Sequence, residues 1–140
     1  MEKALNSNTH WWPTRAQWEE AEQKIATRKF GFFDGGCFIL AVALTKVISG
    51  STIATMLLDG EVDHYLIKLP LLITAQTGLI YADAGGCYRS SEAAAKSYAK
   101  RIGEVYKNLN ISVIDRLVSC PAVPRSAKLS KELAQILQNK

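Results

Sequence analysis

The sequence predicts an α+β domain, with helices packed on a small antiparallel sheet. Three observations favour this class. The expected elements follow the order helix, buried helix, strands, helix, strand, helix. A turn signal at Asp59-Gly60 and a loop after Pro70 separate the central strands, which is typical of hairpins. The 140 residues, of which 48% are hydrophobic and 21% charged, suit one ordered domain with a single core.

The first two elements are expected to be helices of different character. Pro13 and Thr14 mark a helix start, with Thr14 as the cap. Residues 15–29 then carry an apolar stripe and charges elsewhere, as in an amphipathic surface helix. This stripe consists of Trp18, Ala21 and Ile25. Residues 37–48 (CFILAVALTKVI) are apolar almost all round, which predicts a helix buried on most sides. The intervening FGFFDGG predicts a packed loop with unusual backbone angles.

The middle of the chain is expected to supply most of the sheet. Residues 51–58 (STIATMLL) fit either a strand or a short helix. Residues 62–69 (VDHYLIKL) predict a strand that Pro70 closes, and residues 78–84 (GLIYADA) predict a second strand. The alternation predicts two faces on the first of these strands. One face carries Val62, His64 and Leu66, and the other carries Asp63, Tyr65 and Ile67.

The last third is expected to form two helices around one strand. A helix capped by Ser90 or Ser91 is predicted to run to about Asn108. Its inner stripe would consist of Ala95, Tyr98, Ile102 and Val105. Residues 111–118 predict a strand, and residues 127–140 predict a terminal helix with Leu129, Leu133 and Leu137 on one face. We therefore expect a single domain over residues 1–140, with an N-terminal segment (1–13), a core (14–118), and a linker and C-terminal helix (119–140).

The formal net charge of +4 is unevenly distributed. Residues 1–60 carry six basic and six acidic groups, whereas residues 91–140 carry nine basic and four acidic groups. A basic region can bind nucleic acid, an anionic membrane or an acidic partner. A nucleic-acid site here would use Lys96, Lys100, Arg101, Lys107, Arg116, Arg125 and Lys128. Because aromatic and basic residues do not interleave there, a solvated surface is the favoured interpretation and we expect no nucleic-acid partner.

The location follows from what the chain does not contain. The N-terminus, MEKALNSNTHWWP, is polar and has no apolar signal region. No stretch approaches the ~20 apolar residues that span a bilayer. The three cysteines are odd in number and have no close pairs, which argues against a disulfide framework. We therefore expect a cytoplasmic protein without a membrane span, with delivery into another cell left open.

Three polar residues stand at positions with a chemical meaning. Cys37 begins the buried helix, His64 lies inside an apolar strand, and Asp83 ends the next strand. The dipole and free N–H groups of a helix N-terminus favour a thiolate and can bind an oxyanion. A histidine can take the thiol proton and later protonate a leaving group, and a carboxylate can orient that histidine. The hypothesis is a Cys–His–Asp triad.

Each of these residues also has a purely structural interpretation. A buried cysteine is often a small apolar core residue, a strand histidine is often a satisfied core residue, and aspartate often forms turns. The order of the three residues along the chain favours the triad. Cys87 and Cys120 are interpreted as structural, and His10 is given no catalytic role. Cys87 follows a Gly-Gly turn and could lie near Asp83, so it is the rival candidate for the reactive thiol. No cysteine or histidine cluster has metal-ligand spacing, and we expect no metal or other cofactor.

The motifs DGGCFILAVAL, DHYLIKL and GLIYADAGG together resemble the framework of papain-like cysteine hydrolases. The compact spacing is similar to bacterial and phage members, including C39-like peptidases, papain-like toxin domains, and transglutaminase-like or arylamine N-acetyltransferase-like proteins. The resemblance covers roughly residues 30–90. It implies a papain-like fold in which Cys37 is the nucleophile, His64 the general base and acid, and Asp83 the orienting residue.

One feature departs from that framework. Papain-like peptidases commonly have a glutamine shortly before the cysteine, whereas KFGFFDGG contains neither glutamine nor asparagine. The oxyanion would then depend on the Cys37 N–H and another backbone donor in the loop of Gly35 and Gly36. The predicted function is a thiol hydrolase or acyltransferase acting on an amide, as a deamidase, amidase or peptidase with a protein or peptide substrate.

The alternative is a non-catalytic binding protein on the same fold. Its small size suits a phage or mobile-element inhibitor that docks on a host protein. Its binding surface would be either the aromatic N-terminus, with Trp11, Trp12 and Trp18, or the basic C-terminal third. Exposed tryptophans are good interface anchors, so Trp11 and Trp12 are the candidate binding residues.

Overall fold

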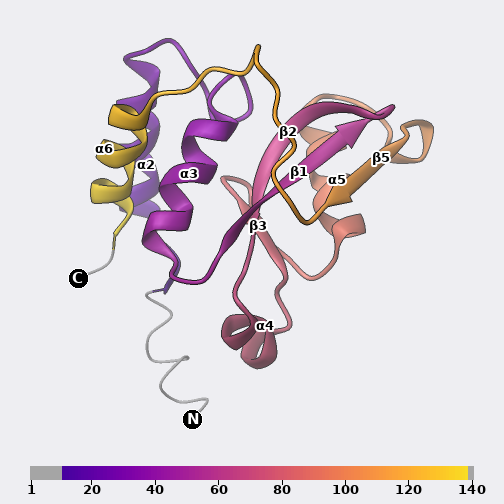
Figure 1. Ribbon diagram of the computed structural model, residues 1–140, viewed down its shortest axis with the longest axis horizontal. Helices are drawn as coiled ribbons and strands as arrows, with labels where there is room; N and C mark the ends of the chain where they lie inside the picture. The colour runs from indigo at the N-terminus through magenta and orange to yellow at the C-terminus, as the bar shows by residue number, and fades with distance from the viewer. Residues whose placement is uncertain (1–10, 139–140) are drawn as a thin grey trace.

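A computed structural model of the chain describes residues 11–138 (Figure 1). Most of the predicted N-terminal segment, including His10, lies outside the described residues. The helices are α2 (Arg15–Ala26), α3 (Cys37–Val47), α4 (Leu71–Thr77), α5 (Ser91–Arg101), α6 (Ala127–Leu137) and a 3-10 turn η2 (Tyr106–Asn108). The strands are β1 (Thr52–Leu58), β2 (Glu61–Lys68), β3 (Tyr81–Asp83), β4 (Gly86–Tyr88) and β5 (Ile111–Ile114).

One antiparallel sheet organises the molecule. Its strand order is β4-β3-β2-β1-β5, and every adjacent pair is antiparallel. Helices α2, α3 and α6 gather on one side of the sheet, while α5 packs beside β3, β4 and β5 (Figure 1). The predicted α+β class with helices on a small antiparallel sheet is therefore confirmed.

Two apolar clusters fill the space on either side of the sheet. The larger one joins α2, α3 and α6 to Tyr65 and Ile67 of β2. The smaller one joins Leu66 to Tyr98 of α5. Successive residues of β2 thus face opposite clusters, as the alternation in the sequence predicts. His64 shares the face of Leu66 and is therefore directed to the α5 side.

The two helices before the sheet form as the sequence predicts. Thr14 caps α2 through a capping box with Gln17, and Ala21 and Ile25 are buried. Helix α3 is buried along most of its length, which explains why it has no polar face. The C-terminal helix buries its leucine stripe against these two helices, with Leu129, Leu133 and Leu137 at most 1% exposed.

Several element boundaries differ from the prediction. The ambiguous segment 51–58 is a central strand, β1, because it pairs with both β2 and β5. The predicted second strand of the hairpin is shortened to β3. The connection that precedes it folds into α4, which begins after Pro70 and ends at Gly78 with a φ of 79°. The side chains of Leu71 and Leu72 at its start are 83% and 67% exposed.

Two expectations in the last third were wrong. The predicted helix to Asn108 ends at Arg101, because Gly103 has a φ of 79° and stops the helix. Val105, expected on its inner stripe, is 55% exposed. The predicted strand 111–118 ends at Ile114. Residues beyond it form side-chain bonds instead: Thr55 Oγ1 donates to the Arg116 carbonyl and accepts from the Val118 N–H.

Candidate active site

The thiol of Cys37 lies at the first residue of α3. The residue is 8% exposed, and its preceding loop is closed by hydrogen bonds between Gly31 and Asp34. No side chain of the described residues caps this helix start. The first intrahelical N–H bond is the one from Leu40 to the Gly36 carbonyl, at 3.0 Å. The N–H groups of Cys37, Phe38 and Ile39 therefore have no intrahelical acceptor and lie at the end of the helix that carries the thiol.

Each of the two positions before Cys37 requires glycine for a different structural reason. Gly35 has a φ of 89°, which favours glycine. Gly36 has an ordinary φ, but a Cβ there would lie 2.5 Å from Ile25 Cδ1 and 2.7 Å from the Gly31 carbonyl oxygen. The Gly36 N–H donates to that same carbonyl at 2.9 Å. These glycines shape the loop, and the Gly36 amide does not supply the backbone oxyanion donor that the sequence suggested.

His64 and Asp83 meet at the end of the β2–β3 ladder. That ladder pairs Ile67 with Ala82 and Lys68 with Tyr81, and pairing stops there. Beyond the last pair, Asp83 is one residue past Ala82 and His64 is three residues before Ile67, and His64 Nε2 lies 3.0 Å from Asp83 Oδ2. The two side chains are 2% and 4% exposed. Because Nε2 is bonded to the carboxylate, Nδ1 is the imidazole nitrogen left for Cys37.

Asp83 is held from two further directions. Its Oδ1 accepts hydrogen bonds from the Gly85 N–H at 2.8 Å and from the Tyr88 hydroxyl at 2.7 Å. The Tyr88 hydroxyl also lies 3.0 Å from Ser97 Oγ of α5. Three hydrogen-bond donors on one buried carboxylate fix its orientation.

The imidazole of His64 is enclosed between two aromatic rings. Phe33 stacks on it with a centroid distance of 5.2 Å, and Tyr98 of α5 stacks on it at 4.7 Å. The interplanar angles are 18° and 19°. The Tyr98 hydroxyl is held in turn by Asp63, through its carbonyl at 3.2 Å and its carboxylate. The ring plane of the histidine is thus fixed by packing from both sides.

The environment sets the protonation of the pair. Burial raises the pKa of the Cys37 thiol, but the hydrogen bond and charge of His64 and the N–H groups of Tyr65 and Phe38 lower it below its ordinary value. Burial lowers the pKa of His64, but the hydrogen bonds that its ring donates to Asp83 and Cys37, together with the charges of these two groups, outweigh burial and raise that pKa to about 9. The two directions together favour a thiolate–imidazolium pair.

The other thiols differ from Cys37. Cys87 is half-buried and faces no histidine; burial and the Asp83 charge raise its pKa to about 12. Cys120 lies in the linker before α6 and is also half-buried. All three thiols are free. Of the three thiols, Cys37 is the one that interacts with His64.

The tryptophans predicted to bind a partner pack against other aromatic rings. Trp11 and Trp12 are half-buried, with ring centroids 5.9 Å apart, and the Trp12 and Trp18 centroids lie 5.3 Å apart; both pairs of rings are tilted. Trp18 packs edge-on against Phe32 at 5.7 Å. This series of rings covers the larger apolar cluster. Their contacts are those of core packing, and their role in binding stays a prediction.

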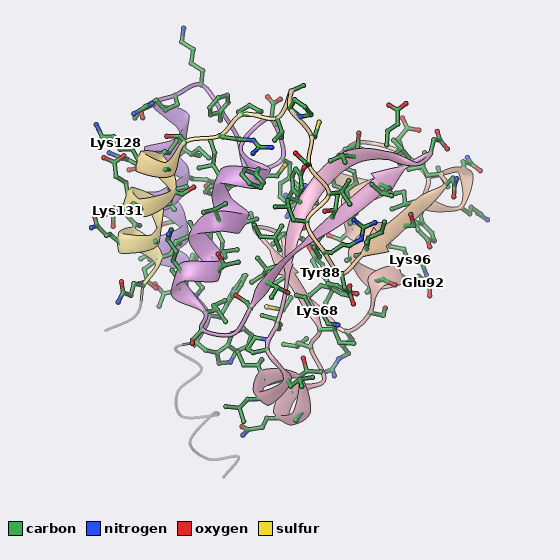
Figure 2. The ribbon with its side chains drawn as sticks, in the orientation of Figure 1. Lys68, Tyr88, Glu92, Lys96, Lys128 and Lys131 are labelled. Carbon is green, nitrogen blue, oxygen red and sulfur yellow. The ribbon has the colours of Figure 1, made fainter. Side chains whose placement is uncertain are left out.

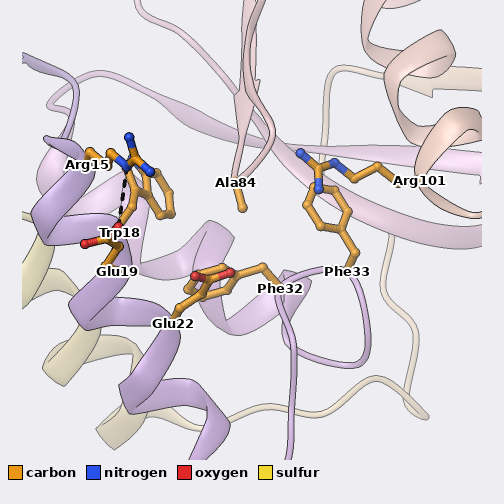
Figure 3. A pocket seen from close by; sticks show the side chains of 8 residues that line it. All are labelled: Arg15, Trp18, Glu19, Glu22, Phe32, Phe33, Ala84 and Arg101. Carbon is orange, nitrogen blue, oxygen red and sulfur yellow. Dashed lines mark ion pairs between the residues drawn. The ribbon is translucent and has the colours of Figure 1, made fainter.

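An open cleft of about 340 Å³ adjoins the buried triad (Figure 3). We call it the aromatic cleft; it is lined by Arg15, Trp18, Glu19, Glu22, Phe32, Phe33, Ala84 and Arg101. Phe32 and Ala84 also line the small space around Cys37 and His64. The cleft and the thiol are therefore separated by one layer of side chains.

The basic side chains of the last third are spread over the molecule. Lys128 and Lys131 project from α6 at one edge, whereas Lys96 lies beside α5 at the other (Figure 2). Lys96 pairs with Glu92 at 3.5 Å, and Lys68 pairs with Asp115 at 2.8 Å. Such a distribution favours the solvated-surface interpretation. No helix in residues 11–138 is both long enough and apolar enough to cross a membrane.

Sequence reasoning found the three polar residues and missed their supports. Phe33, Tyr88 and Tyr98 belong to a loop, a short strand and a helix whose relative placement depends on the tertiary structure. The only signal was the density of aromatic residues in FGFFDGG. Between Trp11 and Gln138, no group of three histidine, cysteine or acidic side chains could hold a metal ion. Comparisons with family models, curated proteins and solved structures gave no significant match.

Proposed function

We propose that this chain is a papain-like cysteine hydrolase or acyltransferase acting on an amide, as a deamidase, amidase or peptidase. The observation that carries the proposal is that the His64 imidazole lies against both the Cys37 thiol and the Asp83 carboxylate, with His64 Nε2 3.0 Å from Asp83 Oδ2. Burial of the two partner side chains to 4% exposure or less removes competition from water.

In the first half of the reaction, the Cys37 thiolate attacks the carbonyl carbon of the amide and forms an S–C bond. The electron pair of the carbonyl moves to oxygen, and N–H groups at the start of α3 stabilise that oxyanion. When the tetrahedral intermediate collapses, the C–N bond breaks. The His64 imidazolium gives its proton to the departing nitrogen, which leaves as ammonia or an amine.

In the second half, neutral His64 takes a proton from water or from an acceptor amine. The resulting nucleophile attacks the thioester carbonyl, the C–S bond breaks, and the thiolate–imidazolium pair is restored. Water gives a carboxylic acid, and an amine gives a new amide. Asp83 keeps the imidazole in one orientation and stabilises its cation throughout.

The first test is the reactivity of the three thiols with iodoacetamide at pH 7, resolved by mass spectrometry. We expect Cys37 to be labelled at least about tenfold faster than Cys87 or Cys120, because the thiolate is the nucleophile. His64→Ala should remove that preference. The matched control is Lys107→Ala, an exposed substitution away from the triad, and thermal melting verifies that each variant is folded.

Slow labelling of all three thiols that ignores His64 would contradict the proposal. Cys37 would then be a core residue, and the alternative of a non-catalytic binding protein would be favoured.

A further inference from the structure

The aromatic cleft beside the triad carries two charges that the fold leaves without ion-pair partners among residues 11–138. Arg15 and Glu19 on one wall pair with each other at 3.4 Å. Glu22 on that wall and Arg101 on the opposite wall make no ion pair with another described residue. Figure 3 shows Glu22 and Arg101 on opposite sides of the cleft, with Glu22 near Phe32 and Arg101 beside Phe33.

Arg101 is held in position although no carboxylate binds it. Its guanidinium carbon lies 4.5 Å from the centroid of the Phe33 ring, a cation–π contact. Its Nε and Nη2 lie so close to Gly85 that a Cβ there would be 3.2 Å from each of them. An arginine oriented in this way, with its donors unused by a carboxylate, is suited to bind one from a ligand.

Arg101 is also connected to the catalytic residues through its own contacts. The Phe33 ring contacts the Arg101 guanidinium and also stacks on His64. Gly85 donates its N–H to Asp83. The same two residues thus contact both Arg101 and the proposed proton-transfer pair, so an anion bound at Arg101 lies next to the triad.

The rest of the cleft limits the size and charge of a ligand. A volume of about 340 Å³ lies at the lower end of the range for small-molecule sites. Trp18, Phe32 and Phe33 supply apolar ring surfaces that suit a planar or apolar group. The Glu22 carboxylate on the far wall would repel a second negative charge on the ligand.

We infer that the aromatic cleft binds the substrate, and that this substrate is a compact amide carrying a single carboxylate that Arg101 holds. The carboxylate binds at Arg101, the apolar body packs on Phe32 and Trp18, and the amide carbonyl reaches Cys37 past Ala84. This inference rests on the proposed function, since it assigns the substrate class of the same thiol.

The test uses two alkylating probes of equal shape, 4-(iodoacetamido)benzoate and 4-(iodoacetamido)benzamide. In each, the thiolate forms an S–C bond and iodide leaves, so only the carboxylate differs. We expect the benzoate to label Cys37 about tenfold faster than the benzamide at low ionic strength. Arg101→Gln should reduce that ratio to near one.

The matched control is Arg28→Gln, which makes the same change of charge at an exposed position outside the cleft. It should leave the ratio unchanged. A ratio that falls equally in both variants would overturn the inference, because net charge rather than Arg101 would then attract the probe. A ratio near one in the parent protein, with fast labelling by both probes, would overturn the carboxylate assignment and leave the cysteine mechanism in place.

A second measurement does not depend on the reactivity of the thiol. Trp18 lines the cleft, so binding there should change its fluorescence. In Cys37→Ser, 4-acetamidobenzoate should change tryptophan fluorescence in a saturable way and 4-acetamidobenzamide should bind at least about fivefold more weakly. Equal binding of the two compounds, or none by either, would overturn the inference even if the thiol proves active.

Discussion

The ring of Phe33 lies nearly parallel to the imidazole of His64, with 5.2 Å between centroids and 18° between planes. The loop that precedes Cys37 thereby covers the base with which Cys37 is paired. Tyr98 covers the opposite face at 4.7 Å. A histidine enclosed in this way has one ring orientation, and its proton exchange is governed by the Asp83 carboxylate and the thiol rather than by bulk water.

The pH dependence of amide hydrolysis should therefore be bell-shaped. Activity rises as Cys37 ionises, at a pH below that of an ordinary thiol because its pKa is lowered. Activity falls near pH 9, where His64 loses its proton, because the raised pKa keeps the imidazolium present up to that pH and the leaving nitrogen needs its proton. The measurement is the rate with an amide substrate between pH 4 and pH 11.

The pH profile of Cys37 alkylation supplies the control for that experiment. It requires only the thiolate, so it should rise through the lowered pKa and show no fall near pH 9. In His64→Ala, only the N–H groups of Tyr65 and Phe38 still oppose burial, which has the largest effect on the thiol, and the midpoint should shift above the ~8.5 of a free thiol. An unshifted midpoint would contradict the ion pair.

Asp83→Asn should lower the pKa of His64. The carboxylate raises that pKa against the effect of burial, so without its charge the imidazole becomes neutral at a lower pH. Labelling of Cys37 at pH 7 should slow by roughly tenfold, and amide hydrolysis should fall by several orders of magnitude. NMR titration measures the His64 pKa directly, since the chain has two histidines.

Tyr88→Phe is the matched control for that substitution. It removes one hydrogen bond to Asp83 Oδ1 and leaves the one from Gly85. It should cost about 1 kcal/mol of unfolding free energy and leave the His64 pKa near 9. A His64 pKa that stays near 9 in Asp83→Asn as well would show that Asp83 does not set it.

Ala84→Leu should hinder the approach of reagents from the aromatic cleft to the thiol. Ala84 lines both the cleft and the closed space around Cys37, so a larger side chain there adds bulk between the two. Labelling of Cys37 by a bulky reagent should slow by about tenfold or more, while the melting temperature changes little. Ala122→Leu, at an exposed position in the linker, is the control. Unchanged labelling would mean that reagents reach Cys37 by another route.

Gly36→Ala should destabilise the loop before Cys37. Its Cβ would lie 2.5 Å from Ile25 Cδ1 and 2.7 Å from the Gly31 oxygen, and backbone cannot yield as a flexible side chain does. We expect a loss of about 2–4 kcal/mol in unfolding free energy. Denaturant unfolding measures it.

Gly60→Ala provides the contrasting case for that measurement. Gly60 has a φ of 82°, but a Cβ added there would meet no atom within 4 Å, so only backbone strain opposes the alanine. Its cost should be about 1 kcal/mol. Equal losses in the two variants would show that crowding at Gly36 is relieved by movement of the loop.

Local patterns in the sequence were sufficient for the helices that carry their own signals. Thr14 and Gln17 form the capping box, and the leucine stripe of α6 is buried as its spacing predicts. The boundaries of β3 and α4 were not predictable in the same way. The segment 70–77 is too short for its hydrophobic pattern to distinguish a helix from a strand. In the structure it is a helix, which ends at Gly78 in the left-handed backbone conformation.

The sequence by itself determined the identity and order of Cys37, His64 and Asp83, because each interrupts a strong apolar pattern. Only the tertiary structure decided that they meet. The β2–β3 ladder stops at Ile67 and Ala82, which leaves His64 and Asp83 free to pair. The rings of Phe33 and Tyr98, the hydroxyl of Tyr88 and the guanidinium of Arg101 come from separate parts of the chain. Their side chains converge because packing, which acts between segments distant in sequence, places them around one imidazole and one cleft.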